Sequence, residues 1–223
     1  MGSEMCIRDR FWDSGNTGSA TLNKNVTTYD ATIKHSGNYS AKLQSQYVAL
    51  FGIGAFAAGN VFVGKFLKID GTDGILRFGR PFTSRPSKLV LYYRYVAGTV
   101  DYSTLSELPK NSKDMGSIYI ALGDWPHQTF EGETDIPVLV KTKPADRQLF
   151  DSNSSNVIGY GECILKESTE GEGLIKLEIP INYRSNRKPT DIILVGSASR
   201  YGDYFTGSTG STLWLDDLEL IYE

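Results

Sequence analysis

Two adjacent carboxylates, Asp216 and Asp217, lie in the middle of an apolar segment near the end of the chain, TLWLDDLELIY from Thr212 to Tyr222. Successive residues of a β-strand point to opposite faces of a sheet, so one of the two side chains should face the packed side of the strand. A carboxylate in such a place is costly unless it is paired or binds a cation. The alternative is an edge strand whose aspartate points to water.

Aromatic and planar polar side chains that could hold a sugar form a second candidate group: Tyr92, Arg94, Trp125, Tyr201 and Asp203. Sugars stack their C–H faces on aromatic rings, and polar side chains bind their hydroxyls. Trp125 lies in a polar loop, GDWPH, where an exposed indole is expected to contact a ligand. The alternative is that this indole folds back onto the edge of the domain.

Catalytic groups are harder to identify. A glycosidase uses two carboxyl groups on either side of the bond that it cleaves. Glu131, Glu133 and Asp135 lie together in one polar loop, but no motif distinguishes an acid from a nucleophile. His35 and His127 are far apart, and no serine lies in a G-x-S-x-G turn. The residues favour binding without catalysis, with a hydrolase or lyase that uses loop carboxylates as the alternative.

Strands must position these residues, because apolar and polar positions alternate with a period of two through most of the chain. The alternation is clearest from Leu174 to Tyr183, where Ile175, Leu177 and Ile179 should face inward. Strands are predicted at residues 39–44, 60–67, 75–78, 88–97, 117–122, 136–141, 157–166, 174–183, 191–199 and 212–222. About ten strands with short turns predict an all-β fold, a β-sandwich of two antiparallel sheets.

The bulk properties limit the partners. With 23 basic and 26 acidic residues the net charge is -3, which gives no electrostatic reason to bind nucleic acid or an anionic membrane. No stretch approaches the roughly 20 apolar residues of a membrane helix. Met1–Arg10 (MGSEMCIRDR) has no apolar signal-peptide core, so we expect a non-native or artefactual leader before one domain at Phe11–Glu223, with the native export signal missing.

Several segments, in order along the chain, resemble known carbohydrate-related domains. The ends, HSGNYSAKL from His35 and LDDLEL from Leu215, are similar to jelly-roll carbohydrate-binding modules, in which a short aromatic and acidic strand like FWD from Phe11 comes first. The middle resembles the putative carbohydrate metabolism domain family in the segments LRFGRPF, YYRY and SASRYGDYF. The resemblance covers nearly the whole chain.

This resemblance implies a jelly-roll β-sandwich at the C-terminus of a surface lipoprotein of Gram-negative gut bacteria. In similar modules, an acidic residue of the first strand, the carbonyls of the SG turn and an aspartate of the closing strand meet around a structural calcium ion, which binds oxygen ligands. The matching positions are Asp13, the turn at 35–38, and Asp216 or Asp217. Such an ion would pin the two chain ends together. The alternative is that Asp13 only caps a turn.

The predicted function is therefore a non-catalytic, glycan-binding module of an exported protein at the extracellular or outer-membrane surface. Its partner would be a polysaccharide or oligosaccharide, and it would be attached to another domain. A glycoside hydrolase or lyase of β-sandwich fold, and a protein-binding adhesion domain, are the alternatives.

Overall fold

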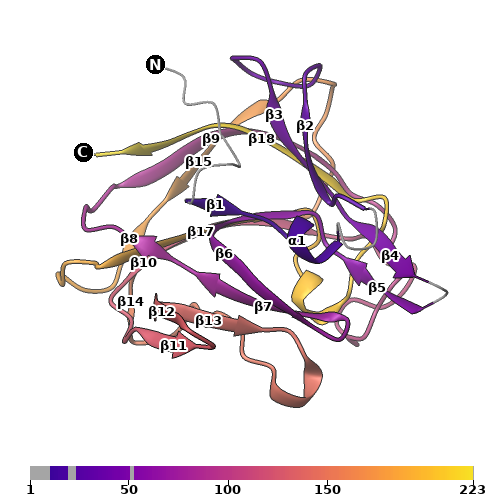
Figure 1. Cartoon of the computed structure of the whole chain (residues 1–223). Helices are drawn as coiled ribbons and strands as arrows, with labels where there is room; N and C mark the ends of the chain where they lie inside the picture. The colour runs from indigo at the N-terminus through magenta and orange to yellow at the C-terminus, as the bar shows by residue number, and fades with distance from the viewer. Residues whose placement is uncertain (1–10, 20–23, 51–52, 223) are drawn as a thin grey trace.

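The protein folds into two large antiparallel sheets that pack face to face (Figure 1). This computed structural model describes residues 11–19, 24–50 and 53–222. The segment Met1–Arg10, expected to be a leader, lies outside the described residues. No helix in the described ranges is long and apolar enough to cross a membrane.

The larger sheet has nine strands. Seven of them lie side by side in the order β13 (Val138–Lys141), β7 (Asp73–Phe78), β6 (Asn60–Asp70), β17 (Asp191–Ser197), β10 (Gly116–Gly123), β14 (Val157–Leu165) and β16 (Asn182–Tyr183). The other two are short: β1 (Trp12–Asp13) pairs with β6, and β8 (Arg80–Pro81) pairs with β17.

The second sheet has five strands in the order β15 (Ile175–Pro180), β9 (Lys88–Val96), β18 (Thr212–Ile221), β3 (Ser40–Gln44) and β2 (Thr27–Asp30). Two hairpins stand apart: β4 (Gln46–Leu50) with β5 (Ile53–Ala57), and β11 (Gln128–Phe130) with β12 (Glu133–Ile136). The helical elements are α1 (Asn16–Ser19), η2 (Pro144–Asp146) and η3 (Gly202–Tyr204).

The main core lies between the two large sheets. Leu89, Leu91 and Tyr95 of β9 face it, as the alternating pattern predicts, and they meet Ile120 and Leu194 from the nine-stranded sheet. A second apolar cluster covers the other face of that sheet, around Ile193 and Val195 of β17. Because β17 is buried on both faces, its sequence is a nearly continuous apolar run.

The structure confirms the all-β sandwich, and each of the ten predicted segments contains a strand. The described residues form eighteen strands, more than the predicted ten, because several strands have only two to five residues. Periodicity is hard to recognise in so short a segment.

The two ends of the domain do not pair as neighbouring strands. β1 pairs with β6 in one sheet, whereas β18 lies between β9 and β3 in the other. Trp12 and Leu218 pack against the same core from opposite sheets. The expectation that the ends are pinned side by side was therefore wrong about the pairing.

A bulge in β18 resolves the problem of its two aspartates. The register with β9 shifts between Asp216 and Glu219, and Asp217 adopts a left-handed backbone conformation with φ of 47°. The extra residues let Leu215 and Leu218 both pack against the core while neither aspartate is forced into it.

Candidate functional site: a pocket between two hairpins

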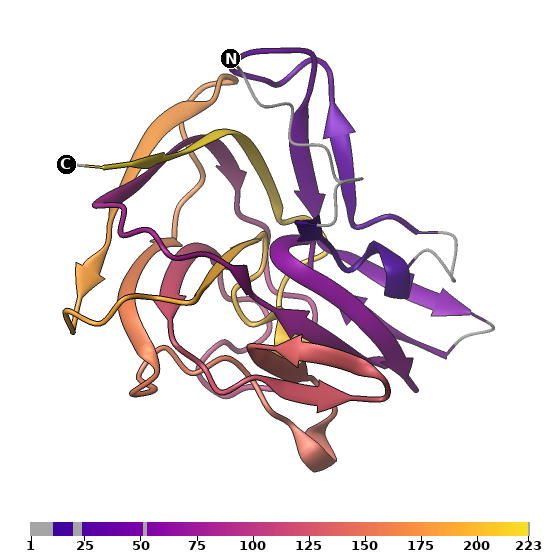
Figure 2. The same cartoon turned by 60° about the vertical axis from the view of Figure 1, so that its left-hand side comes forward.

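A pocket of about 220 Å³ opens between the β4–β5 hairpin and the β6–β7 hairpin. Both hairpins extend toward the same side of the molecule, with α1 between them (Figure 2). The segment 202–205, which contains η3, closes another side of the pocket. Glycines and alanines leave the space open, chiefly Gly15, Gly18, Ala55, Ala57, Ala58, Gly71 and Gly74.

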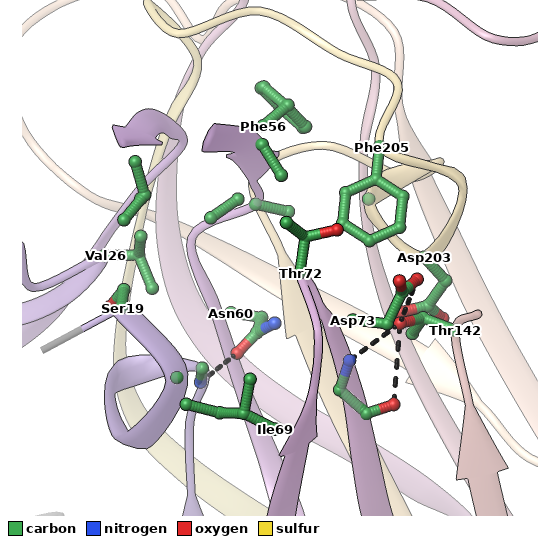
Figure 3. A pocket seen from close by; sticks show the side chains of 18 of the residues that line it. Ser19, Val26, Phe56, Asn60, Ile69, Thr72, Asp73, Thr142, Asp203 and Phe205 are labelled. Carbon is green, nitrogen blue, oxygen red and sulfur yellow. Dashed lines mark hydrogen bonds between the residues drawn. The ribbon is translucent and has the colours of Figure 1, made fainter. Parts of the chain in front are cut away.

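Most of the pocket wall is apolar. Phe56 reaches it from β5, Phe66 and Ile69 from β6, and Phe205 from the segment after η3 (Figure 3). Phe205 has a left-handed backbone conformation with φ of 53°, which is unfavourable for a bulky residue. Its N–H donates to the carbonyl of Gly202 at 2.8 Å, so the turn holds the ring in place.

The segment that carries Asp203 is fixed to its surroundings by close packing. A Cβ atom at Gly202 would lie 2.3 Å from the Cβ of Ala58, so only glycine allows this approach to the chain after β5. The hydroxyl of Thr104 donates to the carbonyl of Tyr204 at 2.6 Å. Asp203 is therefore presented by a well-supported turn.

Two carboxyl groups lie at one end of the pocket, as Figure 3 shows. Burial raises the pKa of Asp73, and the hydroxyl of Thr142, which donates to it at 3.4 Å, opposes that rise. Burial raises the pKa of Asp203 to about 6, although Arg147 acts in the opposite direction. Among the residues that the structure describes, the carboxyl of Asp203 makes no hydrogen bond or ion pair.

Polar groups also lie elsewhere on the pocket wall. Asn60 accepts a hydrogen bond from the N–H of Gly15 at 2.7 Å, and its amide nitrogen donates to no described residue. Ser19 is only 5% exposed, and within residues 11–19, 24–50 and 53–222 its hydroxyl has no partner. Apolar walls with separate, unsatisfied polar groups suit a small ring that has C–H faces and several hydroxyls.

Two of the predicted sugar-binding residues lie at or beside this pocket. Asp203 lines the pocket, and sugar binding by Asp203 stays a prediction. Tyr201 precedes η3 and packs edge-on against Tyr204, with ring centroids 6.4 Å apart, outside the pocket lining. Tyr201 therefore supports the turn that presents Asp203.

Trp125 is buried, which matches the alternative that its indole folds back onto the edge of the domain and not the exposed indole. It is only 7% exposed and belongs to the cluster on the outer face of the nine-stranded sheet. The indole folds back over Gly123, where the missing side chain leaves room, and packs edge-on against Phe150. This conformation leaves little area on which a sugar could stack.

Tyr92 and Arg94 lie on the outer face of the five-stranded sheet, away from the pocket. The ring of His35 stacks on Tyr92, with centroids 3.3 Å apart, and so covers it. The guanidinium of Arg94 lies 5.1 Å from the ring centroid of Trp214. Both side chains already have protein partners where a sugar was expected.

The three predicted calcium ligands are surrounded by hydrogen-bond donors. Asp216 accepts from the N–H groups of His35 and Ser36 at 2.7 and 3.3 Å, so the predicted turn and strand do meet. Asp217 bonds the His35 ring, and Asp13 accepts from the N–H of Phe66 at 2.7 Å. Within the described residues, no group of three acidic, histidine or cysteine side chains is placed to hold a metal.

This arrangement does not fit a calcium site built on those three carboxylates, because calcium needs oxygen ligands and the turn presents N–H groups. One contact of Asp13 agrees with the alternative that this residue only caps a turn. Its carboxylate accepts a hydrogen bond from the N–H of Ser14 at 2.8 Å. Calcium binding stays a prediction of the sequence.

Most residues of the pocket carry no sequence pattern that predicts ligand binding. Asn60 lies in a predicted strand, and Phe56, Asp73 and Thr142 lie outside the predicted strands, so none of them stands out as a binding residue. The signal that was available is the unusual run DGTDG at residues 70–74, which places a second acidic residue in one hairpin turn. Nothing in the sequence shows that this turn meets Asp203.

Comparisons with known proteins agree with this fold. A family model described as the putative carbohydrate metabolism domain matches residues 3–221. A search among curated proteins finds no match.

Among solved structures, one described as a putative glycoside hydrolase from Bacteroides thetaiotaomicron is similar to this chain, with 24% sequence identity and a TM-score of 0.68. The match covers 95% of this chain and 63% of that protein. Another with the same description, from Bacteroides vulgatus, has the same identity and TM-score over 95% of this chain and 85% of that one. At this identity the likeness shows the fold. The chain spans less than two thirds of the first of these proteins.

Proposed function

The chain belongs to the putative carbohydrate metabolism domain family, and from this premise we propose that it binds a glycan without cleaving it, through the pocket between the β4–β5 and β6–β7 hairpins. We further propose that the domain works outside the cell or at the outer-membrane surface, as a part of a longer protein.

One observation carries the choice of site. The carboxyl of Asp203 lines a largely apolar pocket and, among the described residues, has no hydrogen-bond partner and no close ion pair, although Arg147 acts on it from a greater distance. Asp203 is only partly buried, so its carboxyl oxygens are open to the pocket and can accept hydrogen bonds from a ligand. A ligand could donate hydrogen bonds to Asp203, and the partly buried ring of Phe205 could cover one of its C–H faces.

The size of the pocket limits what it binds. Its volume of about 220 Å³ is below the roughly 300–1,000 Å³ of sites for drug-sized ligands. It therefore suits one sugar unit, such as the end or a side branch of a chain. A single contact of this kind would be weak, and repeated units on one polysaccharide would multiply it.

Hydrolysis is the second candidate, and a specific feature favours it. Asp73 and Asp203 lie at the same end of the pocket, and burial raises the pKa of both. Pairs of carboxyl groups with shifted pKa values serve as acid and base in glycosidases. The loop carboxylates named from the sequence are less suitable, because Glu131 and Glu133 are paired with Lys68 and Lys65.

The experiment compares polysaccharide affinity electrophoresis with an assay for new reducing ends, on the same glycans. We expect retardation of the wild-type protein and no reducing ends. Asp203→Asn should abolish retardation, whereas Glu131→Gln, an exposed carboxylate outside the pocket, should not. Release of reducing ends that Asp203→Asn removes would establish the hydrolase. A protein that neither retards nor releases sugar from any glycan would contradict both, as an adhesion domain would.

The surface location needs its own test. Intact cells that produce the full-length protein should lose the domain when an external protease is added. If only lysed cells lose it, the proposed location is wrong.

A further inference from the structure

We propose that the sugar unit taken by this pocket carries a positively charged amino group, as an unacetylated hexosamine does, with the amine placed at Asp73 and Asp203. This inference rests on the proposed function, because it names the ligand class for the same pocket.

The first step concerns the charges around the two carboxyl groups. The cations that approach this end of the pocket already have other contacts. Lys143 pairs with Asp70 at 3.0 Å. The Nε of Arg147 donates to the carbonyl of Thr142 at 3.0 Å, and its guanidinium lies 4.6 Å from the ring centroid of Tyr204. The protein thus supplies one guanidinium that acts on both carboxyl groups, and one ammonium, already paired with Asp70, that acts on Asp73.

The second step concerns what this imbalance does. A cation held close to a carboxyl lowers its pKa, whereas burial raises it. For Asp73 and Asp203 the effect of burial prevails, although Arg147 acts on both. An ammonium group on the ligand would supply the charge that the protein does not. The titratable and charged groups that act on this end, beside the two carboxyls, are Asp70, Lys143, Arg147 and, on β10, Tyr119.

The third step separates the classes of sugar. A uronic acid would bring a further negative charge toward two carboxyl groups, which is unfavourable in a site of low polarity. A neutral sugar would offer Asp203 only hydroxyl donors. Hydrogen bonds to a charged partner are roughly twice as strong as neutral ones, so an amine should be preferred over both.

The rest of the pocket fits the remainder of such a ring. The amide nitrogen of Asn60 and the buried hydroxyl of Ser19 have no partner within the described part of the chain. Ser19 is an observation independent of the two carboxyls, and it also indicates a polar ligand. Phe205, which is only partly buried, lies on the pocket wall beside Asp203, where the C–H face of a ring could pack (Figure 3).

The experiment is isothermal titration of the full chain with three short oligosaccharides: one of unacetylated glucosamine, its fully N-acetylated counterpart, and one of uronic acid. At about pH 6 we expect the amine-bearing oligosaccharide to bind at least about tenfold more tightly than the acetylated one, with no binding of the uronic acid. Asp203→Asn and Asp73→Asn should each reduce this preference, whereas Glu131→Gln should keep it.

A second measurement needs no variant. Binding of an ammonium group should ionise Asp203, so titrations in buffers of different ionisation enthalpy at about pH 5.5 should show proton release. Equal affinity for the amine and its acetylated counterpart, or proton uptake on binding, would overturn the inference while leaving glycan binding intact. If no oligosaccharide binds, in these titrations or on a broad glycan array, the proposed function itself fails.

Discussion

The aspartates of this protein differ in what surrounds their carboxyl groups, and that difference separates structure from function. Asp216 is held by backbone N–H groups of the turn at 35–36. Asp114 is fully buried and is surrounded by donors. Asp203 has no donor among the described residues. A carboxylate that is fully hydrogen-bonded organises the fold, whereas one without a partner in a pocket is a candidate for binding a ligand.

Asp114 should be a main determinant of stability. Its Oδ2 accepts from the hydroxyls of Ser199 and Ser211 at 2.6 and 2.7 Å and from the N–H of Ser208 at 2.8 Å. Asp114→Ala should lower the free energy of unfolding by about 2–4 kcal/mol, because three buried donors lose their acceptor. Urea denaturation measures this.

The matched control is Asp101→Ala, since Asp101 is exposed and bonds Thr209 in the same region. It should cost less than about 1 kcal/mol. Equal losses for the two variants would contradict the role given to Asp114.

Asp203 should make stability depend on pH. Its pKa of about 6 lies above that of the unfolded chain, so the folded protein holds the proton more tightly. Its contribution to stability is therefore largest below about pH 4 and is lost as the pH rises to about 6. Solvent reaches the partly buried carboxyl and weakens the effect. We therefore expect the unfolding free energy of wild type, relative to that of Asp203→Asn, to fall by about 1–2 kcal/mol between pH 4 and pH 6. A constant difference between pH 4 and 6 would show that the pKa is not raised.

Calcium can be tested at the residues named for it. Because N–H groups already bond Asp216 and Asp13, we expect the melting temperature to be the same in a chelator and in added calcium. A lower melting temperature in the chelator would restore the sequence-based prediction of a structural ion.

At the scale of elements, the strands could be predicted from the sequence, but their meeting points could not. The alternation in β9, and in β15 at Leu177 and Ile179, follows from burial of one face, which is a local pattern. Ile175, which was expected to face inward, is 45% exposed at the start of the edge strand β15. The pocket depends on the turn after β6, the end of β5 and η3, which are far apart in the sequence. Trp125 shows the same limit, because a polar loop sequence does not reveal that Gly123 leaves space for the indole.

The position of η3 can be tested through Gly202. A methyl group there would meet the Cβ of Ala58 at 2.3 Å and should push the segment 202–205 away from the pocket. Gly202→Ala should therefore weaken glycan binding about tenfold or more, and binding assays on the folded variant measure this. Gly173→Ala is the control, because nothing lies within 4 Å of its added Cβ and its turn is outside the pocket. Unchanged binding by Gly202→Ala would mean that this turn does not shape the site.

At the scale of the whole molecule, the sandwich acts as a frame that holds two hairpins and one turn around a pocket. The nine-stranded sheet is covered on both faces by apolar clusters, so β6 and β17 are rigid supports for the elements that line the site. The outer face of the five-stranded sheet, where Tyr92 and Arg94 lie, is occupied by stacked side chains of the protein itself. The fold therefore places Asp203, Asn60 and Ser19 around one pocket at the side of the sandwich where these two hairpins lie.

The most direct test of glycan binding at this pocket is an NMR titration of the labelled protein with an oligosaccharide that retards it in gels. The account predicts that amide shifts concentrate at residues 54–58, 71–74 and 202–205 and that the oligosaccharide stays intact. Shifts confined to the strands that carry Tyr92, Arg94 and Trp214 would contradict it.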